Sequence, residues 1–536
     1  MKKVLICIVI LCLGFTSFAQ KGKIKVPKPP VKMTKEQMYE DFDQFVAYVK
    51  DFNAQIEVRK MVTGYDMINE ILIEREKIDE INNYWEFFDL MTRCLNKTLD
   101  IHARRTVGYY VVEEPRYMPG QSFYDSTYFK EIESQYNIYK EGKAQEYRKR
   151  NKFSPFMDYY FNGDYYAHGQ YTLINKISKE DTLYLSDFKI LSCNSLPIDS
   201  LVYLKFGHLE PSEIKWDFQN RKYYTTNLSI TCEDTILLYD PNSNKQYLLN
   251  LNDYNFIISG CSDSLINENI YFYLENKKLS RNKVVEYYPK ERILYIYTDE
   301  MWDATNLFID EIKNVGKNKK IDKVIIDLRD NYGGGDDFWQ DMLSVIVSDT
   351  IKWLSTLALN DNEQCIHFFT TEYPTHVTGK YHSQVIPTLN WKKMIVREQQ
   401  YKYIIPDSNS LNYKGKIYII QNENTYSAAH SMTSLARQDS NLISIGVPTG
   451  HIAGFGLNPW NFQLKNSKFT FQFETAIDLT KVQNPEDVFQ DIPEMIVSPT
   501  LKEMFKYMDY GLILDKRSYD FMINYDYVFK KVLELE

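Results

Sequence analysis

The sequence predicts an α/β protein with a largely parallel central sheet. Two stretches in its second half each have the pattern strand, helix, strand, with apolar runs such as ILYIYT and KVIIDL as strands. Such alternation predicts parallel strands, and their right-handed connections place the loops after the strands at the carboxyl edge. The elements are expected at 293–298, 304–315 and 323–328, then at 416–421, from Ser427 onward and at 442–446.

Two further units precede this sheet. The pattern from Thr34 to about Leu99 is helical, and from 171 to 263 short strands alternate with turn residues. Residues 468–479 are expected to add an antiparallel edge to the sheet. The predicted boundaries are 1–19 for a signal peptide, 20–33 for a flexible leader, 34–105 for an N-terminal helical domain, 106–280 for a connection and β-rich module, 281–500 for the sheet domain and 501–536 for a C-terminal helical extension.

The first 20 residues have the pattern of a cleavable export signal. Two lysines precede the apolar run 4–15, and Ser17-Phe18-Ala19 forms a small-x-small cleavage site. The run is too short to span a membrane, and no later window is long and apolar enough. We therefore expect an exported protein, periplasmic or secreted, without a membrane span.

Composition excludes several classes of function. The net charge of -9 argues against a nucleic-acid partner. The cysteines outside the signal segment are odd in number and far apart, so neither a disulfide framework nor a zinc pattern is visible. We expect no metal and no cofactor.

Residues 327–335 (DLRDNYGGG) join a strand to a helix through three consecutive glycines. Glycine tolerates positive φ and lets a ligand approach the backbone, so this turn can aim several N–H groups at one developing negative charge. A tight turn with nothing bound is the alternative. A phosphate site is disfavoured, because neither G-x-x-x-x-G-K-[ST] nor G-x-G-x-x-G occurs here.

Ser427 follows the corresponding strand of the second unit and stands at the start of a helix. A serine in this place is most often a helix N-cap. Here, however, neighbouring parallel strands would bring the N–H groups of Gly334, Gly335 and Ala428 around its hydroxyl. The pattern therefore favours a serine nucleophile beside an oxyanion site.

A serine hydroxyl needs a base, and three histidines have a notable context. His102 lies where the helical domain gives way to a strand, His430 is on the Ser427 helix, and His451 is in a glycine-rich loop. A lone histidine is more often structural than catalytic, so only its combination with the serine discriminates.

DLRDNYGGG (327–335), NTYSAAH (424–430) and IGVPTG (445–450) together resemble the tail-specific or C-terminal processing serine peptidases and the catalytic core of tricorn protease. Asp100-Ile101-His102 resembles the D-x-H segment of this family, and residues 187–198 resemble part of its PDZ domain. The resemblance implies a crotonase/ClpP-like β-α-β core at 281–500 and a degenerate PDZ-like module within 106–280.

Members of this family use one of two chemistries. One is a Ser-Lys dyad, but Ile452 stands where the lysine would fall. The resemblance therefore implies the other: Ser427 as nucleophile, His102 as base, and Glu486 or Asp487 as the acid, which spacing does not separate. His430 stands where the family usually has glutamate.

The predicted function is that of an exported serine endopeptidase that hydrolyses peptide bonds in peptides or protein tails, through Ser427, His102 and a backbone oxyanion hole. Its partner would be a peptide or an unfolded protein. The alternative is a catalytically inactive, peptide-binding relative of the same family. An α/β-hydrolase esterase ranks third, because no G-x-S-x-G occurs.

Overall fold

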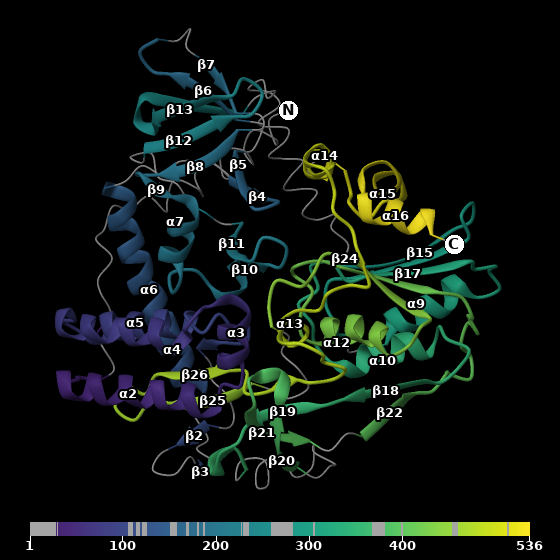
Figure 1. Cartoon of the computed structure of the whole chain (residues 1–536), viewed down its shortest axis with the longest axis horizontal. Helices are drawn as coiled ribbons and strands as arrows, with labels where there is room; N and C mark the ends of the chain where they lie inside the picture. Colours follow the sequence, from purple (N-terminus) through teal and green to yellow (C-terminus); the bar gives the residue numbers. More distant parts are fainter. Residues whose placement is uncertain are drawn as a thin grey trace, which may run out of the picture.

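Figure 1 shows the computed structural model of the chain. The predicted signal peptide and most of the predicted leader lie outside the residues that the structure describes. Among the described residues, no helix combines the length and the apolarity that crossing a membrane requires. The structure describes residues 28, 31–105, 111–113, 118–120, 126–150, 158–167, 171–178, 182–185, 188–226, 228, 235–258, 282–303, 306–366, 381–397, 400–452, 459–511 and 514–535.

A six-stranded sheet forms the centre of the second half of the chain, in the order β15-β16-β17-β23-β24-β28. β15 pairs antiparallel with β16, and all other neighbours are parallel. The mixed α/β class and both β-α-β units are confirmed. The strands are β15 (Lys283–Tyr288), β16 (Ile293–Thr298), β17 (Lys323–Asp327), β23 (Ile417–Gln421), β24 (Leu442–Gly446) and β28 (Met495–Ile496).

Helices cover both faces of this sheet (Figure 1). Ile296, Ile326 and Ile419 point to one face, where they pack with α9, α10 and α12. Their neighbours in sequence point to the other face, where they pack with α15 and α16. This alternation follows from the period of two in a strand. The helices are α9 (Leu307–Gly316), α10 (Asp336–Ser344), α12 (Ala428–Ser434), α14 (Leu501–Gly511), α15 (Tyr519–Tyr525) and α16 (Tyr527–Glu534).

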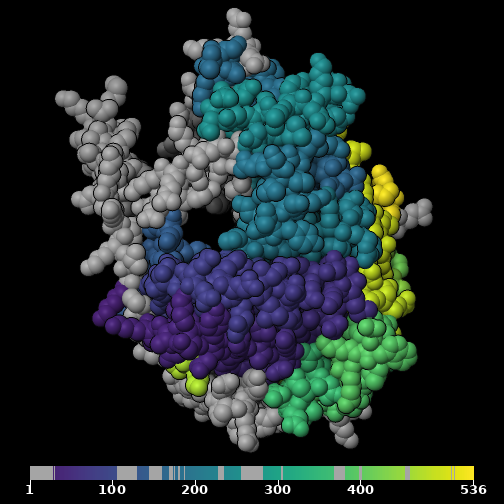
Figure 2. All heavy atoms as spheres, turned by 60° about the vertical axis from the view of Figure 1, so that its left-hand side comes forward, coloured from purple at the N-terminus to yellow at the C-terminus, as the bar shows by residue number. Residues whose placement is uncertain are grey.

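The N-terminal helices share a core with the β-rich module and with segments that come late in the sequence. Thr34 and Gln37 form a capping box at the start of α2, as the sequence pattern indicates. In Figure 2 these helices lie directly below the module. The helices and nearby strands are α2 (Lys35–Phe52), α3 (Gln55–Thr63), α4 (Met67–Leu72), α5 (Tyr84–Asn96), β1 (Arg104–Arg105), β2 (Val111–Glu113), β3 (Met118–Gly120) and α6 (Ser126–Arg150).

The module between α6 and the central sheet is built from short strands in three sheets. Its hairpin β10–β11 lies apart from the larger sheet and faces the half of the chain that contains the central sheet (Figure 1). The elements are β4 (Asp158–Phe161), β5 (Asp164–Ala167), β6 (Tyr171–Asn175), β7 (Thr182–Tyr184), β8 (Lys189–Cys193), β9 (Leu196–Pro197), α7 (Ile198–Lys205), β10 (Ile214–Asp217), β11 (Lys222–Thr225), β12 (Thr235–Asp240), β13 (Lys245–Asn250) and β14 (Tyr254–Ile258).

The prediction that residues 468–479 form an antiparallel edge strand of the central sheet is wrong. β26 pairs with β25 in a separate sheet with β1, and β15 is the antiparallel edge of the central sheet. The cause is packing against the N-terminal helices, because the rings of Phe471 and Phe45 are 5.0 Å apart. The remaining elements are β18 (Ile351–Ser355), β19 (Leu357–Asn360), β20 (Tyr381–Ile386), β21 (Lys392–Arg397), β22 (Gln400–Ile404), β25 (Trp460–Gln463), β26 (Thr470–Phe473), β27 (Ile477–Asp478) and α13 (Pro485–Phe489).

Candidate active site

Ser427 occupies a strained turn between β23 and α12. Its backbone has φ 54° and ψ −126°, a conformation that residues other than glycine rarely adopt. Two hydrogen bonds hold the turn: the Ser431 N–H donates to the Ser427 carbonyl at 2.9 Å, and the Ala429 N–H donates to the Tyr426 carbonyl at 3.1 Å. Such outliers persist only where the surroundings enforce them, and they concentrate at functional sites.

The glycine turn packs directly against Ser427. A Cβ added to Gly333 would lie 2.5 Å from the Ser427 Cβ and 2.9 Å from the Ala428 nitrogen, and Gly333 has φ +98°. Only glycine fits under both constraints. The Tyr426 N–H donates to the Asn331 carbonyl at 3.0 Å and so joins the two loops.

Two backbone N–H groups at this junction are available as oxyanion donors. Within the described structure, neither the Gly334 N–H nor the Ala428 N–H forms a hydrogen bond. The Gly335 N–H is committed, because it donates to the Met301 carbonyl at 2.8 Å. The prediction that Gly335 donates to an oxyanion therefore does not fit the geometry, because its N–H is bonded to the segment after β16. The N–H of Gly334 points away from that segment.

His102, whose side chain is 23% exposed, contacts the fully buried Glu474. The His102 Nδ1 atom lies 3.2 Å from Oε2 of Glu474, whose other oxygen accepts the N–H groups of Thr475 and Ala476, each at 3.1 Å. Burial by itself would lower the pKa of His102, but the hydrogen bond and charge of Glu474 outweigh it and raise that pKa. Burial raises the pKa of Glu474 in turn, although His102 opposes the rise.

The structure does not bring Glu486 or Asp487 to His102. Asp487 caps α13 by accepting the N–H groups of Gln483 and Asn484, and Glu486 lies 3.4 Å from Arg221. Both are used locally at a helix start, a role that their sequence also fits. The acid that contacts the histidine is Glu474, which sequence reasoning missed. A single charge in the apolar stretch FTFQFETAI was the available signal.

Asp100 connects the histidine to the acid. Its Oδ1 accepts the His102 N–H at 2.9 Å, and its Oδ2 accepts the Glu474 N–H at 2.6 Å. The Tyr426 hydroxyl lies 3.4 Å from the His102 Nδ1 atom, and the two ring centroids are 4.9 Å apart. Tyr426 directly precedes Ser427, so this contact places the imidazole beside the loop that carries the serine.

The other two histidines are buried, and burial lowers the pKa of each. Burial lowers the pKa of His430 to about 4. Burial, followed by the positive charges of Lys215 and Arg59, holds the pKa of His451 well below its usual range. Ile452 packs into the apolar core, so the position of the family lysine is structural here.

A buried ionic cluster supports the glycine turn from behind. Arg329 Nη2 lies 2.6 Å from both Asp327 and Asp526, and Arg517 lies 3.3 Å from Asp327. Burial opposes ionisation of Asp327, but these guanidinium groups lower its pKa to about 2. The cluster thus ties the C-terminal helices to the loop that contains the glycine turn.

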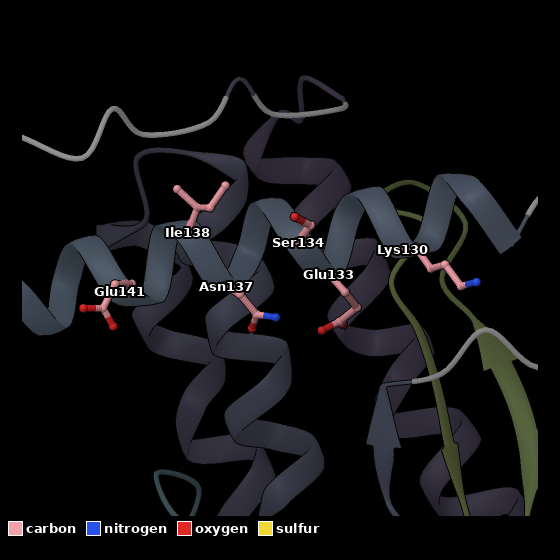
Figure 3. Close-up of a pocket in the computed structure, with 6 residues that line it drawn as sticks. All are labelled: Lys130, Glu133, Ser134, Asn137, Ile138 and Glu141. Carbon is pink, nitrogen blue, oxygen red and sulfur yellow. The ribbon is translucent and has the colours of Figure 1, made fainter. Parts of the chain in front are cut away.

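A large surface hollow lies away from this site. It follows α6 and measures about 760 Å³, and Figure 3 shows that all six labelled residues belong to this one helix. The described residues hold no group of three or more His, Cys, Asp or Glu side chains that could bind a metal ion.

Residues 292–487 match the family model Peptidase family S41. This segment is an S41 peptidase domain. The chain is accordingly a serine-type peptidase, a hydrolase. The S41 domain contains Ser427, the glycine turn and Glu474, whereas His102 precedes it.

Several solved structures resemble this chain in structure, although their sequence identity to it is low. Mature CPAF complexed with lactacystin is 11% identical, with 89% of this chain and 98% of that chain covered and a TM-score of 0.50, which supports the overall fold. The photosystem II D1 C-terminal processing protease is 11% identical, with 90% of this chain and 98% of that chain covered and a TM-score of 0.34. Tricorn protease is 11% identical, with 89% of this chain and 37% of that chain covered and a TM-score of 0.30. A search of curated proteins gave no match.

Proposed function

We propose that this peptidase is an exported serine endopeptidase in which Ser427 is the nucleophile and His102 the general base. The observation that carries the proposal is the His102–Glu474 pair at 3.2 Å, joined through Tyr426 to a strained serine turn that packs on the glycine turn. Its substrates are peptides or protein tails, and its export rests on the N-terminal signal pattern.

The mechanism follows from these positions. Neutral His102 takes the Ser427 proton as the hydroxyl attacks the scissile carbonyl, and Glu474 stabilises the imidazolium that forms. The Gly334 and Ala428 N–H groups stabilise the negative charge on the tetrahedral intermediate. His102 then gives its proton to the leaving amine, and water hydrolyses the acyl-enzyme by the same route.

Substitution of the serine tests this proposal. Ser427→Ala should lower kcat on an unstructured peptide on the order of 10⁶-fold, because nucleophile and base act as a unit. Ser434→Ala, at the other end of α12, is the matched control and should retain activity. A fluorophosphonate probe should label the wild type and Ser434→Ala, but not Ser427→Ala. Peptide binding by a wild type that the probe does not label would instead support the inactive, peptide-binding alternative.

A further inference from the structure

A cavity of about 410 Å³ lies between β20, β21 and the segment that follows β27. The strands β19, β20 and β21 are neighbours in one sheet at the lower edge of the molecule in Figure 1. None of the lining residues is in the glycine turn or in the loop of Ser427, and neither His102 nor Glu474 is among them. The cavity is therefore separate from the candidate active site.

Part of the lining is apolar and comes from three segments. Ile386 ends β20 and Pro387 follows it, Val396 is on β21, and Leu479 and Val482 follow β27. Apolar surface that a ligand covers here is removed from water, which favours binding of an apolar group. The volume is within the range of about 300 to 1,000 Å³ that is usual for small-molecule sites.

Arg397, at the end of β21, brings a positive charge to the cavity. Its Nη2 atom donates to the carbonyl and hydroxyl oxygens of Ser355, both at 3.3 Å, and no carboxylate of the described residues lies within ion-pair distance. The lining contains neither Asp nor Glu. After burial, the charge of Arg397 is what lowers the pKa of Lys402, although Asp336 opposes the shift. The guanidinium charge thus lacks an acidic counterpart in the described part of the chain.

Thr356 gives the cavity a second polar group. It is 3% exposed, its N–H donates to the Thr480 hydroxyl at 2.8 Å, and its carbonyl accepts the Leu479 N–H at 2.7 Å. Its own hydroxyl oxygen has no hydrogen-bond partner among the described residues. Leaving a buried hydroxyl unpaired is unfavourable, so a ligand oxygen that accepts a hydrogen bond from it would relieve that cost.

We propose that this cavity binds a small molecule in which an acidic group is attached to a short apolar chain. Arg397 contacts Ser355, which directly precedes Thr356, so the guanidinium and the free hydroxyl lie close together. Both donate to the anionic oxygens, and a hydrogen bond from a guanidinium to an anion is among the stronger kinds. The apolar lining then covers the chain. The acid is a carboxylate or a phosphate, because both present such oxygens.

Calorimetric titration of the full chain tests this proposal with three probes: hexanoate, hexyl phosphate and hexanol. At least one of the two anions should bind at one site per chain, with a Kd at least about tenfold lower than that of hexanol. The anion with the lower Kd identifies the acid. Arg397→Gln should raise its Kd at least about tenfold, because the charged donor is lost. Thr356→Val should raise it about fivefold, because it removes the hydroxyl and keeps the shape.

Lys393→Gln is the control on the same strand, because Lys393 already pairs with Asp361 at 2.9 Å. It should leave the Kd unchanged. Ser427→Ala should also bind the anion as the wild type does, whereas loss of binding in that variant would place the ligand in the active site and overturn the proposal. So would equal binding of hexanol and the anions, an unchanged Kd in Arg397→Gln, or no binding of either anion. If Arg397→Gln does not fold, an unchanged Kd in Thr356→Val would overturn the proposal instead.

Discussion

Glu474 lies 3.2 Å from His102 although 372 residues separate them in sequence. The two carboxylate oxygens of Asp100 accept the backbone N–H groups of His102 and Glu474, one each. The orientation of the imidazole therefore depends on the turn after α5, which contains Asp100, and on Glu474, which directly follows β26 late in the S41 domain. Contacts between such remote segments form only when the whole fold is in place.

Glu474→Gln should lower kcat on the order of 10⁴-fold with little change in KM. The neutral amide can present the wrong hydrogen-bond partner to Nδ1, which disfavours the tautomer that accepts the serine proton. Glu486→Gln is the control and should stay within about twofold of the wild type. Steady-state kinetics on one peptide would decide, and a large loss only in Glu486→Gln would restore the acid expected from the sequence.

Activity should fall at acidic pH as His102 becomes protonated. Its pKa is raised above the usual value, and a base must be neutral, so kcat/KM should decrease as pH falls through that raised pKa. Glu474 and Asp100 raise this pKa, and Arg104 lowers it. Asp100→Asn should accordingly move the acidic limb to lower pH.

Arg104→Gln removes the opposing charge and should move the same limb slightly to higher pH. Opposite shifts in the two variants are expected only if His102 is the titrating base. Identical profiles for the wild type and both variants would assign the limb to another group.

Gly333→Ala should abolish most activity. The added methyl group would overlap the Ser427 Cβ and the Ala428 nitrogen, and the positive φ adds about 1 kcal/mol or more of strain. Gly64→Ala is a matched control, because Gly64 has φ +75° but open space around its Cβ position. Its free energy of unfolding should fall by a similar amount because of backbone strain, and its kcat should stay unchanged. Thermal unfolding and peptide hydrolysis would separate the two effects.

Asp526→Ala should lower the free energy of unfolding by about 3 to 5 kcal/mol, because it removes one partner of the buried Arg329. It should also weaken catalysis, since Arg329 is in the loop that leads to the glycine turn. Asp520→Ala, on the exposed side of α15, should change stability by no more than about 0.5 kcal/mol. Urea unfolding followed by fluorescence would measure both, and equal stability of the two variants would contradict a supporting role for the cluster.

The sequence alone determined the features that short segments encode. Apolar runs and helical spacing predicted both β-α-β units of the central sheet, because periodicity is local. Ser427 and the glycine turn were also visible, since a strand-to-helix junction with glycines needs only neighbouring residues to specify it. That these two loops pack against each other follows from the pairing of β17 with β23, which the sequence order predicted.

The tertiary structure decided which distant groups meet. It placed Glu474 rather than Glu486 or Asp487 at His102, gave the Gly335 N–H to Met301, and made β15 the antiparallel edge of the sheet. Each outcome depends on packing between segments hundreds of residues apart, such as that of Phe471 on Phe45. Neither spacing nor composition carries that information, because the free energy that selects these contacts arises only when their surfaces are buried together.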